Sequence, residues 1–251
     1  MTINYDRISQ TYDEHRSWEE EVPRRLLSLA SGEATDGTAP ILEIGCGTGN
    51  VTQWIVKHWT GCVIAIDASR GMLSKAAGKV PQARLIQADA GQLPLQSNAF
   101  AGALGSFVLH HLKSGERAGL FAGLHRVLRD TGRSGVAFVT ASHAQIRATY
   151  LNRWFPSIAE VDCARFPDIS VLSEELRDAG FSNIATEGFS RRQPRGDASV
   201  IQRVRSRFMS SLELIPEAEF SNGVAEMERQ IARDGHLGDV SWYATIISAQ
   251  R

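Results

Sequence analysis

Short apolar runs alternate with helical stretches between residues 41 and 140. The runs end near glycine or acidic residues, and the segments between them carry apolar side chains at helical spacing. Strands that alternate with helices of this length are typical of βαβ units. We therefore predict an α/β fold with a doubly wound, mostly parallel sheet that is buried on both faces. The predicted strands are 41–44, 62–66, 83–88, 100–107 and 135–140, and the predicted helices are 51–59, 69–80 and 116–129.

The pattern changes after residue 140. Two more strands bring the predicted sheet to seven strands, and about 50 residues separate these two. A connection of this length predicts a helical cap over a site or a surface for a partner. One helix is expected to begin at a capping Ser173 and to end at Gly180. The predicted elements are a helical or irregular stretch at 143–161, a helix at 173–180, strands at 183–189 and 241–249, a loop or hinge at 190–196, and helical stretches at 198–214 and 217–233.

Composition removes several functional classes. Of 251 residues, 43% are hydrophobic, which is ordinary for a globular protein. The chain has 27 basic and 28 acidic residues and so lacks the basic excess of a dedicated nucleic-acid binder. No apolar run approaches the ~18 residues of a membrane span, and no signal peptide is visible. Three cysteines without Cys-x-x-Cys spacing predict neither a disulfide scaffold nor a zinc module, and they favour a cytoplasmic location.

A glycine-rich turn carries the clearest chemical signal. The segment 42–49, Leu-Glu-Ile-Gly-Cys-Gly-Thr-Gly, follows the first predicted strand and opens a helix. Glycines permit a tight turn and let the backbone approach a ligand without interference from a Cβ atom. The dinucleotide-binding fingerprint requires a further glycine at position 50, where this chain has Asn50. This difference disfavours a nicotinamide-dependent oxidoreductase. The structural alternative is a tight turn with no ligand.

Two aspartates stand where the next two predicted strands end. Asp67 follows the second strand, and Asp89 follows the third. A carboxylate at the end of the second strand can accept hydrogen bonds from the ribose hydroxyls of a nucleoside, and ligands of open parallel sheets bind at the carboxyl ends of strands. The structural alternatives are a helix N-cap for Asp67, for which Ser69 competes, and a solvated turn for Asp89.

This combination resembles the class I S-adenosylmethionine-dependent methyltransferases of the small-molecule type. The resemblance is strong over residues 40–140. It extends to 98–100, 106–112 and 126–133, and to the Tyr-Asp pairs at 5–6 and 12–13. The chain departs from the family at Ala101, where an aspartate is frequent. The resemblance implies a Rossmann-like sheet with a helical cap, S-adenosylmethionine as cofactor and S-adenosylhomocysteine as product.

The resemblance also implies a set of cofactor-binding residues. Glu43 belongs to this set, and Gly45, Gly47 and Gly49 are expected around the methionine part of the cofactor. Asp67 is expected on the ribose, Ala68 and Met72 against the adenine, Asp89 and Ala90 at the adenine edge, and Ser106 near the methionine end. The implied organisation is an N-terminal helical lid at 1–35, a cofactor-binding core at 36–141, and the rest of the sheet at 142–251, with cap insertions at about 142–170 and 190–238.

Tyr12 and Arg16 lie in the predicted lid. An aromatic face suits the sulfonium cation, and the Arg16 guanidinium suits the carboxylate of the cofactor. The alternative for this segment is an amphipathic helix that packs on the sheet.

His110 and His111 follow the fourth predicted strand and are candidates for a catalytic base. A histidine with a pKa near ~6.5 can accept a proton from a hydroxyl or an amine. His143 is a rival for this role, although a histidine pair at 110–111 is frequent in the family whatever the acceptor. No metal site is expected, because no carboxylate or cysteine lies at a matching ligand spacing.

Several cap residues have two open interpretations. The aromatic residues line an acceptor pocket or form the core of the cap, and the arginines steer an anionic acceptor or form a solvated face. The aromatic residues are Trp154, Phe155, Phe166 and Phe208, and the arginines are 191, 192, 195, 203, 205 and 207.

The sequence thus favours methyl transfer to an O, N or C atom of a small-molecule acceptor, by a monomer or homodimer that binds neither nucleic acid nor membrane. One alternative is a protein of the same fold that binds the cofactor without transfer, or that catalyses a cyclisation or rearrangement. Another alternative is a nucleic-acid or protein methyltransferase. The absent basic excess disfavours nucleic acid, and the resemblance implies that a base amine is not the target, because residues 106–109 stand where such enzymes carry an Asn-Pro-Pro-Tyr-type motif.

Overall fold

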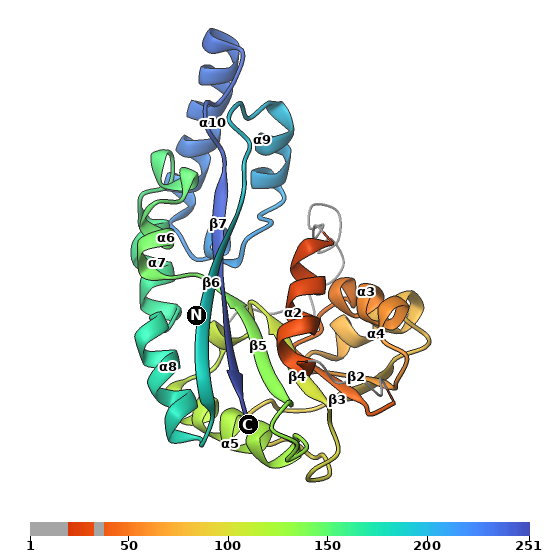
Figure 1. Ribbon diagram of the computed structural model, residues 1–251. Coiled ribbons are helices and arrows are strands. Elements are labelled where there is room, and N and C mark those ends of the chain that lie inside the picture. The colour runs from red at the N-terminus through yellow and green to blue at the C-terminus, as the bar shows by residue number, and fades with distance from the viewer. Residues whose placement is uncertain (1–19, 33–37) are drawn as a thin grey trace.

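A computed structural model describes residues 20–32 and 38–251. Its centre is a seven-stranded sheet with the order β3-β2-β1-β4-β5-β7-β6 (Figure 1). Strands β1 to β5 run parallel, and β7 is antiparallel to both β5 and β6. This arrangement confirms the predicted doubly wound, mostly parallel sheet of seven strands. The strands are β1 (Ile41–Ile44), β2 (Val63–Asp67), β3 (Arg84–Gln87), β4 (Gly102–Ser106), β5 (Gly135–Thr140), β6 (Ser182–Arg191) and β7 (Trp242–Gln250).

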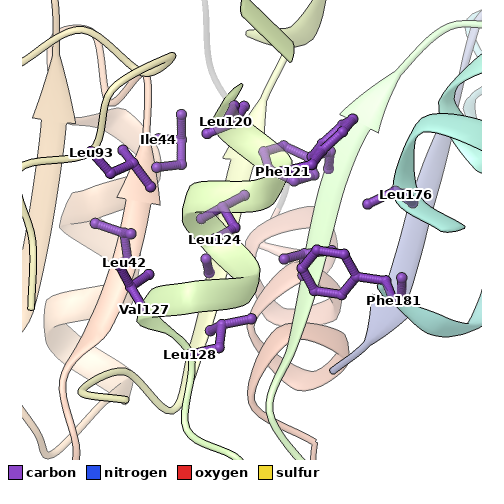
Figure 2. Packing of buried hydrophobic residues seen from close by; sticks show 14 of the residues in the cluster. Leu42, Ile44, Leu93, Leu120, Phe121, Leu124, Val127, Leu128, Leu176 and Phe181 are labelled. Atoms are coloured by element: carbon purple, nitrogen blue, oxygen red, sulfur yellow. The ribbon is translucent and has the colours of Figure 1, made fainter. Parts of the chain in front are cut away.

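Helices cover both faces of the sheet, and no described helix is long and apolar enough to cross a membrane. Leu26 of α2 and Ile55 of α3 pack on one face, and Phe121 of α5 and Leu176 of α8 pack on the other (Figure 2). The helices are α2 (Glu21–Ser31), α3 (Asn50–His58), α4 (Arg70–Lys79), η1 (Leu109–His111), α5 (Ser114–Val127), α6 (His143–Arg147), η2 (Tyr150–Arg153), α7 (Ser157–Arg165), α8 (Ile169–Asp178), α9 (Ala198–Arg205), η3 (Ser210–Glu213) and α10 (Glu217–Asp234).

Most predicted helices differ from the structure by one or two residues at their ends, and the stretches predicted at 173–180 and 198–214 differ by more. Helix α8 begins at Ile169 after Asp168, so Ser173 is not its N-cap; the Ser173 hydroxyl instead donates to the Ile169 carbonyl at 2.8 Å within the helix. The predicted end is confirmed, because Gly180 follows the helix with a φ of +94°. The helical stretch predicted at 198–214 is broken after α9 by Arg207, which has a φ of +50°.

Helix α2 is the described part of the predicted lid, and it packs directly on the sheet. Leu26 and Ala30 are fully buried against β4 and β5. The approach is so close that a Cβ atom on Gly102 would lie 2.3 Å from the Ala30 carbonyl oxygen. Residues 21–31 therefore form a helix that covers one face of the sheet. Residues 1–19, with Tyr12 and Arg16, lie outside the described residues.

Several elements between β5 and β7 form a separate hydrophobic cluster, here called the cap cluster. It joins residues from η2 and α7 to residues from α9, η3 and α10, which are far away in the sequence. Strands β6 and β7 continue past the last residue of β5, and α9 and α10 lie at their far end (Figure 1). The cluster is formed by Leu151, Trp154, Phe155, Ile158, Val200, Ile201, Val204, Leu212, Ile215, Val224, Met227, Leu237 and Val240.

A nearly buried ion pair fastens α5 to α8. The Arg117 guanidinium donates through Nε and Nη2 to the two carboxylate oxygens of Glu175, both at 2.7 Å. Its Nη1 donates to the Leu112 carbonyl at 2.7 Å, in the turn that follows η1. The two side chains are 9% and 13% exposed. The pair therefore holds the turn after β4 as well as the two helices.

We predict that Glu175→Ala lowers the free energy of unfolding by about 3–5 kcal/mol, because it leaves the Arg117 cation buried without its partner. The matched control is Arg25→Ala, which breaks the Arg25–Glu187 pair, whose side chains are 42% and 46% exposed. The control should cost at most about 1 kcal/mol. Urea unfolding measures both values, and equal losses in the two variants would contradict the assignment.

Candidate functional site

The turn from β1 into α3 is a glycine loop, residues 45–49, with left-handed backbone at each of its glycines. The φ angles are +66° at Gly45, +54° at Gly47 and +84° at Gly49, a region in which other residues are strained. A Cβ atom on Gly45 would lie 2.6 Å from Cγ2 of Val108, in the turn after β4. Glycine is therefore needed at position 45 both for the turn and for contact between two loops at the same sheet edge.

Asp67 links the end of β2 to the glycine loop. Its Oδ2 accepts from the Gly47 backbone N–H at 2.8 Å, and its Oδ1 accepts from the Ser69 N–H at 2.8 Å. The Ser69 hydroxyl in turn accepts from the Met72 N–H at 3.1 Å, so Ser69 is the N-cap of α4. The structure thus brings together two features that the sequence places on different strands, and it leaves the Asp67 carboxylate half-buried between them.

The end of β3 lies next to the end of β2. Gln87 pairs with Asp67 in the sheet, and its side chain donates to the Ala68 carbonyl at 3.1 Å. Asp89 is exposed two residues farther on, and its Oδ1 accepts from the Gly91 N–H at 2.8 Å. Ala68 is exposed and Ala90 is half-buried. The predicted adenine side of the site is therefore an open edge where small and acidic residues meet.

Met72 stands apart from the other predicted residues. It lies in the first turn of α4, and the residue is only 2% exposed. Its side chain belongs to the packed interior, so among the predicted adenine contacts it is the one that the packing supports least.

Glu43 lies inside the sheet beneath the glycine loop. It is 2% exposed, and its Oε2 accepts from the Thr52 hydroxyl of α3 at 2.6 Å. Burial raises the pKa of Glu43 to about 8; the Thr52 hydrogen bond opposes this rise, and the nearby Asp67 charge adds to it. Burial and the charges of Glu43 and Asp67 also raise the pKa of the Cys46 thiol. Glu43 therefore joins β1 to α3 in its protonated form at neutral pH.

Two hydroxyls at the carboxyl ends of β4 and β5 have no hydrogen-bond partner among the described residues. They are Ser106 Oγ and Thr140 Oγ1, and both atoms are buried. A buried hydroxyl without a partner costs about 1–3 kcal/mol, a cost that a ligand can remove. Ser106 was predicted for the site. Thr140 was missed, and its position at the end of the fifth predicted strand was the signal that could have found it.

The histidine pair lies in η1, in the turn after β4. The His110 ring stacks on the Phe166 ring with a centroid distance of 4.0 Å and an interplanar angle of 9°, and the His111 ring lies 3.8 Å away. His110 is half-buried and His111 is exposed. His110 comes only two positions after Val108, which contacts the glycine loop. His110 is therefore placed on the side of the site that the predicted methionine end would occupy.

His143, the rival base, is anchored at both ring nitrogens. Nε2 lies 2.8 Å from the Phe166 carbonyl, and Nδ1 lies 3.2 Å from the Asp168 carboxylate. A base needs a nitrogen that faces its substrate, and both nitrogens of His143 face other residues. The geometry therefore favours His110 or His111 over His143 as the proton acceptor.

A cavity of about 530 Å³ lies away from these residues. It is lined by residues 147–150, 152, 153, 239, 241 and 243, from α6, η2 and the start of β7. None of the predicted site residues within 20–32 and 38–251 lines it. We therefore place the candidate site at the strand ends, where the glycine loop, Asp67 and Ser106 converge, and not in this cavity.

Glu43→Gln tests the protonated state of Glu43, since the amide oxygen can still accept from Thr52. The folded protein keeps the Glu43 proton up to about pH 8, whereas the ordinary pKa is 4.5. Between these values the folded state binds more protons, so the stability that Glu43 contributes declines as the pH rises and is lost above about pH 8. The free energy of unfolding of the native protein relative to E43Q should fall by up to about 1.4 kcal/mol per pH unit in this window. Urea unfolding across it measures the slope, and parallel curves would contradict the raised pKa.

Sequence comparisons point to one enzyme class. Residues 41–132 match the family described as methyltransferase domain. The malonyl-acyl carrier protein O-methyltransferase of Marinomonas sp. (strain MWYL1) is 27% identical over 191 residues, which cover 70% of this chain and 68% of that protein. The trans-aconitate 2-methyltransferase of Rhodopseudomonas palustris (strain BisB5) is 31% identical over 105 residues, which cover 40% of this chain and 41% of that protein.

Structural comparison agrees with the sequence match. A protein of Anabaena variabilis ATCC 29413, assigned as a methyltransferase of an antibiotic biosynthesis pathway, has a TM-score of 0.72 at 17% identity, over 94% of this chain and 99% of that chain. At this identity the likeness shows the fold. The matched domain holds the glycine loop, Asp67 and Asp89 within that fold. Residues 41–132 thus match a methyltransferase domain, and the comparisons support the resemblance of the chain to the class I S-adenosylmethionine-dependent methyltransferases.

Proposed function

We propose that this protein transfers a methyl group from S-adenosylmethionine to a small-molecule acceptor at the carboxyl ends of β1, β2 and β4. The observation that carries the proposal is the 2.8 Å hydrogen bond from the Gly47 N–H to Asp67, which joins the glycine loop to the strand-end acid. An adenosine-bearing ligand needs both features together.

The residues at this edge fit the cofactor. Gly45 and Gly49 lack Cβ atoms that would collide with Val108 and crowd Ala76, so glycine at these positions lets the loop adopt the tight turn that would hold the methionine part. The Asp67 carboxylate would hold the ribose, and Asp89 with Ala90 would border the adenine. Ser106 supplies a buried hydroxyl that has no described partner and would lie near the methionine end. The assignment of each contact rests on the resemblance and on these positions.

The protein contributes positioning more than reactive groups. The bound cofactor would supply an activated methyl group on a sulfonium, and the chain must hold the acceptor in line with it. Such alignment is worth up to about 7–11 kcal/mol in well-oriented systems. His110 or His111 would accept a proton from a hydroxyl or amine acceptor. A carboxylate acceptor is already ionised at neutral pH and needs no such base.

A carboxylate oxygen is the acceptor that we favour within the broader O, N or C class. The support comes from the two curated relatives named above, whose names specify a malonyl group and trans-aconitate, both of which carry free carboxylates. The second candidate function is a protein of this fold that binds the cofactor without transferring its methyl group. One product distinguishes the two candidate functions, because only a transferase releases S-adenosylhomocysteine as the acceptor is consumed.

We predict that Asp67→Ala weakens S-adenosylhomocysteine binding by about 1–3 kcal/mol, the scale for the loss of hydrogen bonds to a charged group. Isothermal titration calorimetry measures the change. Asp234→Ala is the control: that aspartate pairs with Arg233 at the end of α10, and its removal should leave the affinity unchanged. Unchanged affinity in Asp67→Ala would remove Asp67 from the site.

Transfer itself is tested by release of S-adenosylhomocysteine from S-adenosylmethionine with trans-aconitate, a malonyl thioester, and hydroxyl and amine acceptors. We expect release with a carboxylate acceptor, and we expect His110→Ala to keep both cofactor affinity and that activity. If the true acceptor is a hydroxyl or an amine, His110→Ala should instead lower turnover by about 10²–10⁴-fold. Cofactor binding without release for any acceptor would favour the second candidate function.

A further inference from the structure

A cluster of rings closes the turn after β4. Phe107 has a φ of +49°, a strained conformation for a bulky residue, and its ring meets the Phe166 ring edge-on at 6.4 Å. The face of Phe166 stacks on His110, with centroids 4.0 Å apart and the planes 9° from parallel. Phe166 comes from the loop between α7 and α8 and is 9% exposed. One cap residue therefore contacts both Phe107 and His110.

The ring cluster lies beside the glycine loop. Val108 stands between Phe107 and His110 in the sequence, and its Cγ2 atom fills the space in which a Cβ atom of Gly45 would lie. The Phe107 N–H donates to the Val139 carbonyl at 2.9 Å, which fixes the start of this turn to β5. The orientation of the His110 ring is therefore set at one end by the sheet and on one face by Phe166.

His143 holds Phe166 in place through the backbone. Nε2 lies 2.8 Å from the Phe166 carbonyl, which only accepts, and Nδ1 lies 3.2 Å from the Asp168 carboxylate. The imidazole ring of His143 thus bridges the Phe166 backbone and the Asp168 side chain. His143 starts α6 directly after β5, and Asp168 precedes α8. The contact thus ties the Phe166 loop to the edge of the sheet.

The other cap aromatics have a different role. Trp154 and Phe155 are buried in the cap cluster, and Phe208 packs against the same cluster. Their packing accounts for them as core residues. Phe166 is outside that cluster, and its ring contacts are with Phe107 and His110. A packing role in the cap therefore does not explain Phe166.

We propose that His143 and Asp168 are positioning residues that hold Phe166 flat on His110, and that Phe166 thereby determines how His110 faces the acceptor. The term acceptor rests on the proposed function, whereas the chain of contacts from Asp168 to His110 does not. Phe166 is then a specificity-determining residue. Its ring occupies space beside His110 that a smaller side chain would open to a bulkier acceptor.

The geometric part is tested by NMR of the histidine rings in the full chain at neutral pH. The Phe166 ring should displace the His110 ring protons upfield, and Phe166→Leu, which keeps an apolar side chain, should abolish the displacement. His143→Ala should do the same, because Phe166 loses its anchor. Asp168→Asn is the matched control, since its amide oxygen still accepts from Nδ1, and it should keep the displacement that Asp168→Ala reduces.

Native His110 signals in a folded His143→Ala protein would overturn the proposal, because a merely structural role for His143 predicts that result. If His143→Ala does not fold, Asp168→Ala decides: it removes the ion pair and keeps the Phe166 hydrogen bond. Native His110 signals in that variant would again overturn the proposal.

The specificity part is tested with Phe166→Leu. Affinity for S-adenosylhomocysteine should be unchanged, and KM for whichever of trans-aconitate or the malonyl thioester is methylated should rise. Unchanged KM with altered cofactor affinity would overturn the specificity role. The two proposals fail separately. Absence of methyl transfer leaves the NMR result standing, whereas methyl transfer without the displaced His110 signals removes only the positioning proposal.

Discussion

Parallel pairing of β1 with β2 and β4 is the constraint on which the site depends. The register sets Ile44 opposite both Ile66 and Gly105, so the three strands end at the same level. The turns that leave these strand ends must then share one small space, which is why Gly47 can donate to Asp67 and why Val108 rests against Gly45. A shift of one residue in the β1–β2 pairing would turn Asp67 to the opposite face of the sheet.

Two different kinds of buried polar group support this edge. Glu43 is held protonated under the loop, where its Oε2 accepts from Thr52, so its burial does not place a charge in the interior. Arg117 stays charged, and its charge is balanced by the Glu175 carboxylate, which accepts two hydrogen bonds from the guanidinium. The Glu43–Thr52 contact fixes the side of the site that the cofactor would use. The Arg117–Glu175 pair fixes the turn that carries His110. The interior thus uses proton binding on one side of the sheet and charge pairing on the other.

Local signals explain what the sequence could predict. The glycine loop, Asp67 and the capping Ser69 depend on neighbouring residues, and the structure places them as the pattern indicates. The start of α8 was missed because Ser173 and Asp168 are both residues that favour an N-cap, and the carboxylate of Asp168 lies against His143, which is far away in the sequence. Phe166 could not be told from Trp154 by sequence, because its role depends on a contact with a residue more than fifty positions away. The predicted contacts of Tyr12 and Arg16 stay predictions, outside the described residues.

The cap cluster joins the two cap insertions, at about 142–170 and 190–238, through one shared hydrophobic core. Apolar side chains from η2 and α7 interlock with those from α9, η3 and α10, although about forty residues and strand β6 separate the two groups along the chain. Removal of either group would expose the apolar side chains of the other to solvent, and a large exposed apolar surface promotes aggregation. To change the acceptor specificity of this protein, both cap segments therefore have to be exchanged together. If only one segment were exchanged, its apolar side chains would not pack against those of the other.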